Sequence, residues 1–248
     1  MTAKAALYQR IPRTAIAFRP EFLDFDRGIR VGHLEDNERI TWLLKTELEY
    51  RYRQPFVTER WGRGVYWQWI GYLPKANRTA KPLSSSVSFG CSKFFLSVDT
   101  SKRRFECGMQ VERGFLKAPS EFRACELRQD WDWHRLLKAM RRRSALEGEI
   151  RRLVRHEGFR IHAGDWETDA DFGKADMVGA LQLKRLLRAA PPGSWAGFQL
   201  YYPMPEEEVR ATNGLDLLEA MLAVFKEVTP VMNLCMQIQL DPEASGNA

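Results

Sequence analysis

Three consecutive segments decide the fold: VSFGCSKFFLSV (87–98), DTSK (99–102) and RRFECGMQV (103–111). The two outer segments are rich in β-branched and aromatic residues, and the segment between them is short and polar, which is typical of an antiparallel hairpin. In the last segment every second residue is apolar: Phe105, Cys107, Met109 and Val111. Because side chains alternate between the two faces of a strand, this pattern predicts one face on a core and the other toward water.

The rest of the chain alternates between helical and extended patterns. Apolar residues recur at helical spacing over 36–54, 130–140, 144–157, 174–190 and 213–229, where Pro230 is expected to break the last helix. Ser144 and Asn213 are expected to cap two of these helices. Extended patterns cover 65–72, 159–162 and 195–202. Strands in the first half and helices in the second predict an α+β fold with an antiparallel sheet packed against several helices.

The domain organisation follows from linkers and charge. No long segment rich in Pro, Gly or Ser divides the 248 residues, which favours a single domain over residues 21–240. Residues 1–20 contain four bases and no acid, and are expected to form a basic N-terminal arm. Residues 241–248 are expected to form a disordered tail.

Composition excludes several classes of protein. Hydrophobic residues make up 44% and charged residues 28%, values that exclude a globally disordered chain. No apolar run approaches the roughly 18–20 residues that a membrane-spanning helix needs. The four cysteines have no C-x-x-C spacing, so we expect buried, reduced thiols and a cytoplasmic protein, with Cys91 and Cys107 facing each other across the hairpin.

The charge is distributed unevenly along the chain. Residues 205–248 contain two bases and eight acids, a net charge of −6, so residues 1–204 carry +12 of a chain whose total is +6. An excess of positive charge on one part of a protein indicates a polyanionic partner. A solvated basic surface without a partner is the alternative.

Arginines are most concentrated in the two predicted helices between residues 130 and 157. The candidates for contact with phosphates are Arg141, Arg142, Arg143, Arg151, Arg152 and Arg155. A second basic patch is expected from Lys75, Arg78 and Lys81, which follow the aromatic run of residues 65–72. Within that run we expect Tyr66 and Tyr72 to be the exposed members that stack on bases. A strand buried on both faces explains the same aromatic run without a function.

A group of carboxylates and a histidine suggests a different function. Asp165, Glu167, Asp169 and Asp171 occupy alternate positions, as ligands do in a calcium-binding loop. However, Ala170 stands where such a loop needs Gly, and Asp176 stands where it has Glu, so an ordinary solvated loop is the alternative. With His162, the first three of these carboxylates are the candidates for a metal-assisted hydrolase.

Several segments resemble a known family. Asn37-Glu-Arg-Ile-Thr-Trp42, followed by Tyr50 and Pro55-Phe56, is similar to the opening of the family catalogued as domain of unknown function 2461. Phe94–Val98 and Phe105–Met109 resemble its aromatic strand and its return strand, and Leu181–Lys184 with Leu215–Pro230 resembles its closing section. Asn77-Arg78 and Lys81-Pro82 stand at its basic motif but lack the Asp and Tyr of that motif. The resemblance spans residues 22–235, and it implies no catalytic residue because the family has no established activity.

These observations lead to three expectations about function. The first is a module that binds a polyanion, nucleic acid above all, through the basic residues named above. The second is the metal-assisted hydrolase. The third is a structural subunit whose basic face meets an acidic protein, for example its own acidic C-terminal region in a homo-oligomer.

Overall fold

The computed structural model describes residues 8–84, 88–166 and 170–241. Residues 1–7 of the expected arm and 242–248 of the expected tail lie outside them. The described helices are α1 (Ile40–Tyr52), α2 (Lys75–Thr79), α3 (Asp132–Ala139), α4 (Ala145–His156), α5 (Ala180–Ala189), α6 (Glu206–Ala211) and α7 (Gly214–Cys235), with short 3-10 turns that include η4 (Ser120–Cys125). The described strands are β1 (Leu23–Asp24), β2 (Gly28–Arg30), β3 (Phe56–Arg63), β4 (Tyr66–Pro74), β5 (Lys93–Asp99), β6 (Arg104–Gly114), β7 (Arg160–Asp165), β8 (Asp171–Phe172) and β9 (Ala196–Pro205).

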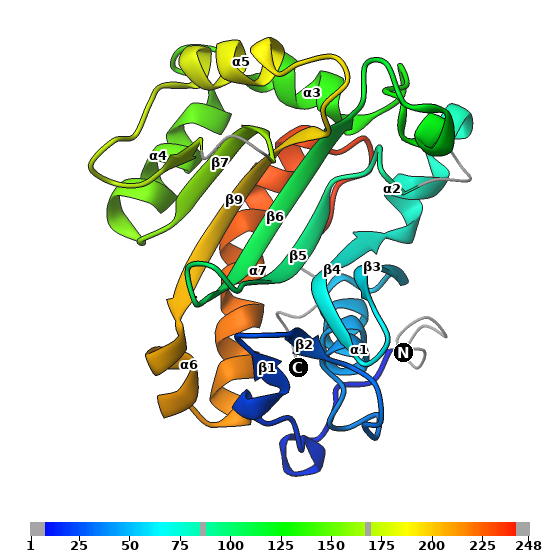
Figure 1. The fold of residues 1–248 in the computed structure, drawn as a ribbon, viewed down its shortest axis with the longest axis vertical. Helices are drawn as coiled ribbons and strands as arrows, with labels where there is room; N and C mark the ends of the chain where they lie inside the picture. Colours follow the sequence, from blue (N-terminus) through cyan, green and yellow to red (C-terminus); the bar gives the residue numbers. More distant parts are fainter. Residues whose placement is uncertain (1–7, 85–87, 167–169, 242–248) are drawn as a thin grey trace.

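The described strands form one antiparallel sheet, as the α+β prediction requires (Figure 1). Its order is β3-β4-β5-β6-β9-β7-β8, and the small hairpin β1-β2 pairs with the beginning of β4. Strands β7 and β9, from the second half of the chain, extend a sheet begun by the first half. Helices α1 to α5 lie in the connections between strands, and α6 and α7 follow the last strand, β9.

The hairpin of residues 93–114 is confirmed. Strands β5 and β6 pair from Lys93↔Gln110 to Asp99↔Arg104, so the polar segment forms the turn. The predicted pairing of Cys91 with Cys107 is wrong, because Leu96 lies opposite Cys107 and Cys91 precedes β5. All four cysteines are free and buried.

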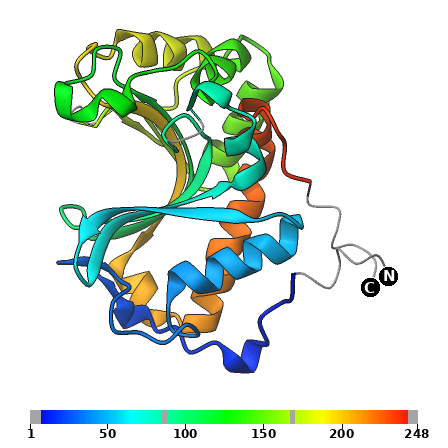
Figure 2. The same cartoon turned by 90° about the vertical axis from the view of Figure 1, so that its right-hand side faces the viewer.

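One face of the sheet carries the hydrophobic core. Phe94 and Leu96 of β5 and Phe105 and Met109 of β6 are buried there, and α7 lies behind these strands in Figure 1. Helices α1, α3 and α4 also pack against α7. On the opposite face of the sheet, which we call the open face, none of the described helices covers the central strands (Figures 1 and 2).

The predicted end of α7 at Pro230 is wrong, because the helix continues to Cys235. Val231, Met232 and Cys235 are buried beyond the proline. Burial of these side chains offsets the hydrogen bond that a proline cannot make.

The predicted caps of α4 and α7 are confirmed. The Ser144 hydroxyl accepts from the Glu147 amide at 3.2 Å, and the Asn213 side chain accepts from the Asp216 amide at 2.9 Å. The helix predicted over 174–190 begins only at Ala180. Among the described residues, no helix has the length and apolar character needed to cross a membrane.

Part of the expected N-terminal arm is packed on the domain. Ile11 and Phe18 are buried, and the Ile11 amide donates to the Glu47 carboxylate at 2.9 Å. Residues 8–20 therefore contribute apolar side chains to the core that the rest of the domain builds.

Candidate functional site

The junction between α3 and α4 presents three consecutive arginines to solvent. Arg141, Arg142 and Arg143 are all exposed. Arg143 has a φ of 57°, and its amide donates to the Glu147 carboxylate at 2.6 Å. The amide of Arg143, and next that of Ala180, lowers the pKa of Glu147. The carboxylate therefore holds the backbone of this junction.

One side of α4 continues this surface. Arg151 and Arg155 follow Glu147 at steps of four residues, so they share a side of the helix. Both arginines are exposed, and Arg151 lies 3.9 Å from the Glu147 carboxylate. We call Arg141, Arg142, Arg143, Arg151 and Arg155 the α4 arginine surface.

Arg152 does not belong to this surface. It contacts the carboxylates of Glu149 at 3.2 Å and of Glu227 at 2.9 Å. Because Glu227 belongs to α7, the side chain of Arg152 joins two helices of the fold. Because these carboxylates already pair with Arg152, we leave it out of the α4 arginine surface, and its expected contact with phosphate stays a prediction.

The second basic patch is only partly present. Lys75 is exposed and Arg78 is half-buried. Lys81 is 0% exposed, and its ammonium lies 2.7 Å from the equally buried Asp132 carboxylate. Asn77 donates to the same carboxylate at 2.8 Å. The expectation that Lys81 contacts phosphates is therefore wrong, because its charge is used inside the protein.

The two tyrosines expected to stack on bases have different environments. Tyr72 is 0% exposed, and its hydroxyl donates to the Ile40 carbonyl at 3.2 Å. Its predicted exposure is wrong because it faces α1 and the core. Tyr66 is half-buried, and the Arg27 guanidinium lies 4.2 Å from its ring centroid.

The structure describes His162 and Asp165, but not residues 167–169, among the residues expected for a metal-assisted hydrolase. The His162 ring hydrogen-bonds to the Asp165 carbonyl at 3.1 Å and stacks on Trp166. Glu167 and Asp169 lie outside the described residues. Across the described parts of the chain, no group of three or more His, Cys, Asp or Glu side chains is arranged to hold a metal. The hydrolase stays a prediction.

The open face of the sheet carries buried charges, among them Glu112, which the alternation pattern assigned to water. Lys93 is 0% exposed, and its ammonium contacts the carboxylates of Glu59 at 2.7 Å and of Glu112 at 2.6 Å. Burial would lower the pKa of Lys93, but Glu112 and then Glu59 raise it above its ordinary value. Burial raises the pKa of Glu112.

An amide network lies beside this triad. Gln110 accepts hydrogen bonds from the Trp69 indole at 3.1 Å and from the Gln199 amide at 2.8 Å. The Trp69 ring lies across Gly71, where a Cβ atom would collide with it. A glycine within a strand is the one local signal of such a close approach.

Side chains of β6 and β9 form a second group of charges with Asp171 of β8, the strand beyond β7 in the sheet. Arg104 contacts Glu106 at 2.7 Å and Asp171 at 3.2 Å, and the Tyr201 hydroxyl donates to Asp171 at 2.9 Å. Burial alone would raise the pKa of Asp171. Hydrogen bonds from Tyr201 and Arg160 lower this pKa by more than burial raises it, so the net shift is downward. Burial raises the pKa of Glu106. Asp171, a candidate calcium ligand, thus already has cationic partners.

Sequence reasoning missed this polar face because its members come from strands far apart in the chain. Glu59 and Lys93 lie on β3 and β5, and no local pattern pairs them.

The sequence matches no protein-family model and no curated protein. The resemblance to the domain of unknown function 2461 therefore stays a prediction, and functional inference rests on the geometry of the side chains.

Proposed function

We propose that the protein binds nucleic acid as a polyanion through the α4 arginine surface. The observation that supports this proposal is the exposure of Arg141, Arg142 and Arg143 at a helix junction. None of these three side chains has an ion-pair partner within 4.0 Å in the part of the chain that the structure describes. Ionic partners for exposed guanidinium groups are therefore supplied by solvent or by a ligand.

The chemistry of arginine favours phosphate as that ligand. A guanidinium donates two parallel hydrogen bonds to phosphate oxygens, and each contact releases a counterion from the nucleic acid. The Glu147 carboxylate holds the backbone amide of Arg143 at 2.6 Å, so the junction is ordered before a ligand binds. Reduced, buried thiols support a cytoplasmic location, which belongs to the same proposal.

The test is the salt dependence of binding to labelled single- and double-stranded DNA and RNA. With three to five phosphates neutralised, affinity is expected to fall by about 40- to 500-fold between about 50 and 200 mM salt. The triple variant Arg141→Ala, Arg142→Ala, Arg143→Ala is expected to bind more weakly. Its log–log salt slope is expected to be smaller by about 3, because each lost phosphate contact contributes about 0.9.

A matched control removes the same charge elsewhere. Arg10, Arg13 and Arg19 are exposed in the N-terminal segment, at the opposite end of the molecule from α3 and α5 (Figure 1). Replacing these three by Ala is expected to leave the salt slope unchanged. Absence of binding at the lower salt, or equal losses in the two triple variants, would contradict the proposal. A stable complex with an acidic protein, or with a second copy of the chain, that persists after nuclease treatment would favour the structural subunit instead.

A further inference from the structure

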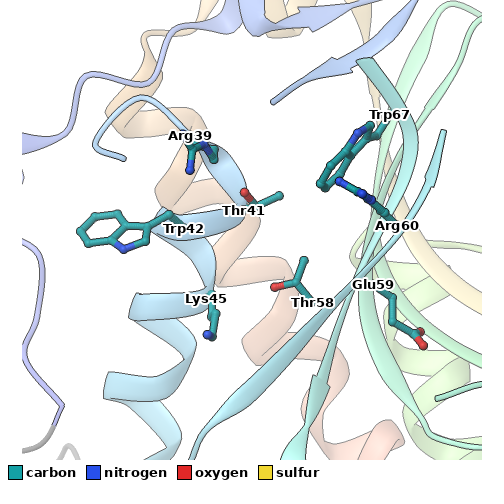
Figure 3. A pocket seen from close by; sticks show the side chains of 8 residues that line it. All are labelled: Arg39, Thr41, Trp42, Lys45, Thr58, Glu59, Arg60 and Trp67. Carbon is teal, nitrogen blue, oxygen red and sulfur yellow. The ribbon is translucent and has the colours of Figure 1, made fainter. Parts of the chain in front are cut away.

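A pocket of about 360 Å³ lies between α1 and the β3-β4 hairpin (Figure 3). Arg39, Thr41 and Lys45 line it from the α1 side, and Thr58, Arg60 and Trp67 line it from the hairpin. Thr58 and Arg60 share the α1 side of β3 because they are two residues apart in a strand. Ligand sites for small molecules have volumes of roughly 300–1,000 Å³, so the pocket has the size of a mononucleotide site.

The pocket is lined with more positive than negative charge. Its three bases are Arg39, Lys45 and Arg60, and its one acid is Glu59. The Glu59 carboxylate points away from the pocket in Figure 3 and contacts the buried Lys93 ammonium at 2.7 Å. This acid is therefore engaged on the opposite face of the sheet and does not neutralise the pocket.

Two of the three bases have only weak acidic partners. Arg39 lies 3.1 Å from Asp36 and also donates to the Leu34 carbonyl at 2.5 Å, and Lys45 lies 3.8 Å from Glu49. Partly exposed pairs of this kind contribute about 0–1 kcal/mol, so they oppose an anionic ligand only weakly. For Arg60, no carboxylate partner exists among residues 8–84, 88–166 and 170–241.

Arg60 is prepared for a planar ligand. Its guanidinium lies 4.3 Å from the centroid of the Trp67 ring, and the side chain is exposed. A guanidinium stacked on an indole by one face offers the other face to an aromatic base. Trp67 is itself held by a hydrogen bond from its indole to the Gly64 carbonyl at 3.2 Å.

Two hydroxyl groups belong to the lining, which also includes Trp42. Thr41 and Thr58 point toward the space between α1 and β3 (Figure 3). In the described chain neither hydroxyl has a hydrogen-bond partner. Each is therefore available to the sugar or phosphate oxygens of a ligand.

We infer that this pocket binds a nucleoside phosphate, with the base stacked on Arg60 and the phosphate held by Arg39 and Lys45. The inference uses no residue of the α4 arginine surface, so either site exists without the other. Removing the phosphate or the ring from the ligand removes one half of the recognition.

The experiment is isothermal titration of the full chain with AMP, adenosine and inorganic phosphate. AMP is expected to bind at least tenfold more tightly than either fragment. Arg60→Ala is expected to weaken AMP binding at least tenfold, and Arg60→Lys is expected to weaken it nearly as much because an ammonium lacks the planar face. The Arg141→Ala, Arg142→Ala, Arg143→Ala variant is expected to bind AMP as the unchanged protein does.

The matched control is Arg63→Ala, which removes an exposed arginine from the same hairpin outside this pocket. Circular dichroism of each variant checks that the hairpin is still folded. No heat with AMP at millimolar concentration would overturn the inference. Equal losses in Arg60→Ala and Arg63→Ala would overturn it as well, because they would show attraction by overall charge only.

Discussion

At the scale of single residues, Lys93 connects the two acids of the open face. It contacts Glu59 and Glu112 at 2.7 and 2.6 Å, and is itself 0% exposed. Removing one member of a buried ionic group leaves the other charges without compensation. The buried Glu112 carboxylate and the partly exposed Glu59 carboxylate would then lie close together without a cation between them.

We predict that Lys93→Met lowers the free energy of unfolding by about 3–5 kcal/mol at neutral pH. The loss is expected to shrink as the pH falls. A carboxyl group whose pKa is raised by folding destabilises the folded state progressively above its unfolded pKa, and protonation below that range removes this cost. Burial already raises the pKa of Glu112, and loss of the ammonium raises it further.

The measurement is urea unfolding of Lys93→Met and of the unchanged protein at about pH 5 and about pH 8. The linkage predicts a larger difference between their free energies of unfolding at the higher pH. Lys226→Met is the control because Lys226 is exposed on α7. A Lys93→Met variant that is equally destabilised at both pH values would contradict the assignment to the carboxylates.

Sequence reasoning separated the two faces of β6 but did not predict the environment of the open face. Alternation in 105–111 correctly placed Phe105 and Met109 in the core. Continued to residue 112, the same alternation assigned Gln110 and Glu112 to water, yet they are 3% and 6% exposed. A period of two shows that two faces exist, but what covers the second face depends on side chains such as Trp69 from another strand.

At the scale of elements, α7 shows where local signals succeed and fail. Its Asn213 cap was predictable because a cap involves residues three positions apart. Its continuation through Pro230 was not predictable, because it depends on burial of Val231 and Met232 against the rest of the domain. Pro230 itself is exposed and contributes little packing.

We predict that Pro230→Ala stabilises the protein by about 2–2.6 kcal/mol. Alanine is favoured over proline by about 3 kcal/mol inside a helix, and the greater freedom of the unfolded chain offsets about 0.4–1 kcal/mol of this gain. The new amide is placed to donate to the Lys226 carbonyl, four residues earlier. Thermal unfolding measures the change, with Pro119→Ala at an exposed position before η4 as the control. A melting temperature that falls, or that rises equally in the control, would disprove this reading.

At the scale of the whole molecule, the fold class followed from the sequence but the strand order did not. β6 pairs with β9, whose residues follow it by about a hundred positions, and no turn or local pattern specifies that pairing. Of the two candidate binding sites, one was predictable from the sequence and the other was not. The run Arg141–Arg143 is visible in the sequence, whereas the pocket of Arg39 and Arg60 exists only because α1 packs beside β3.

The four free thiols lie in different parts of the molecule, so their alkylation rates report on the unfolding of different parts of the structure. Cys107 lies in β6, Cys235 ends α7, Cys91 precedes β5, and Cys125 ends η4. Burial raises the pKa of Cys91 to about 12 and that of Cys125 to about 11. Because the thiolate is the reactive form, an alkylating reagent reaches each sulfur only after its own surroundings have opened.

We predict that Cys125 reacts first when the native protein is incubated with iodoacetamide. Its 3-10 segment is short and its side chain is 5% exposed, whereas Cys107 and Cys235 are 0% exposed in a central strand and the longest helix. Peptide mass spectrometry over time would resolve the four rates, and simultaneous labelling of all four would contradict the order. The alkylation rate of each cysteine thus reports how often its own part of the chain unfolds. Differences among the four rates distinguish local fraying from global unfolding without any added probe.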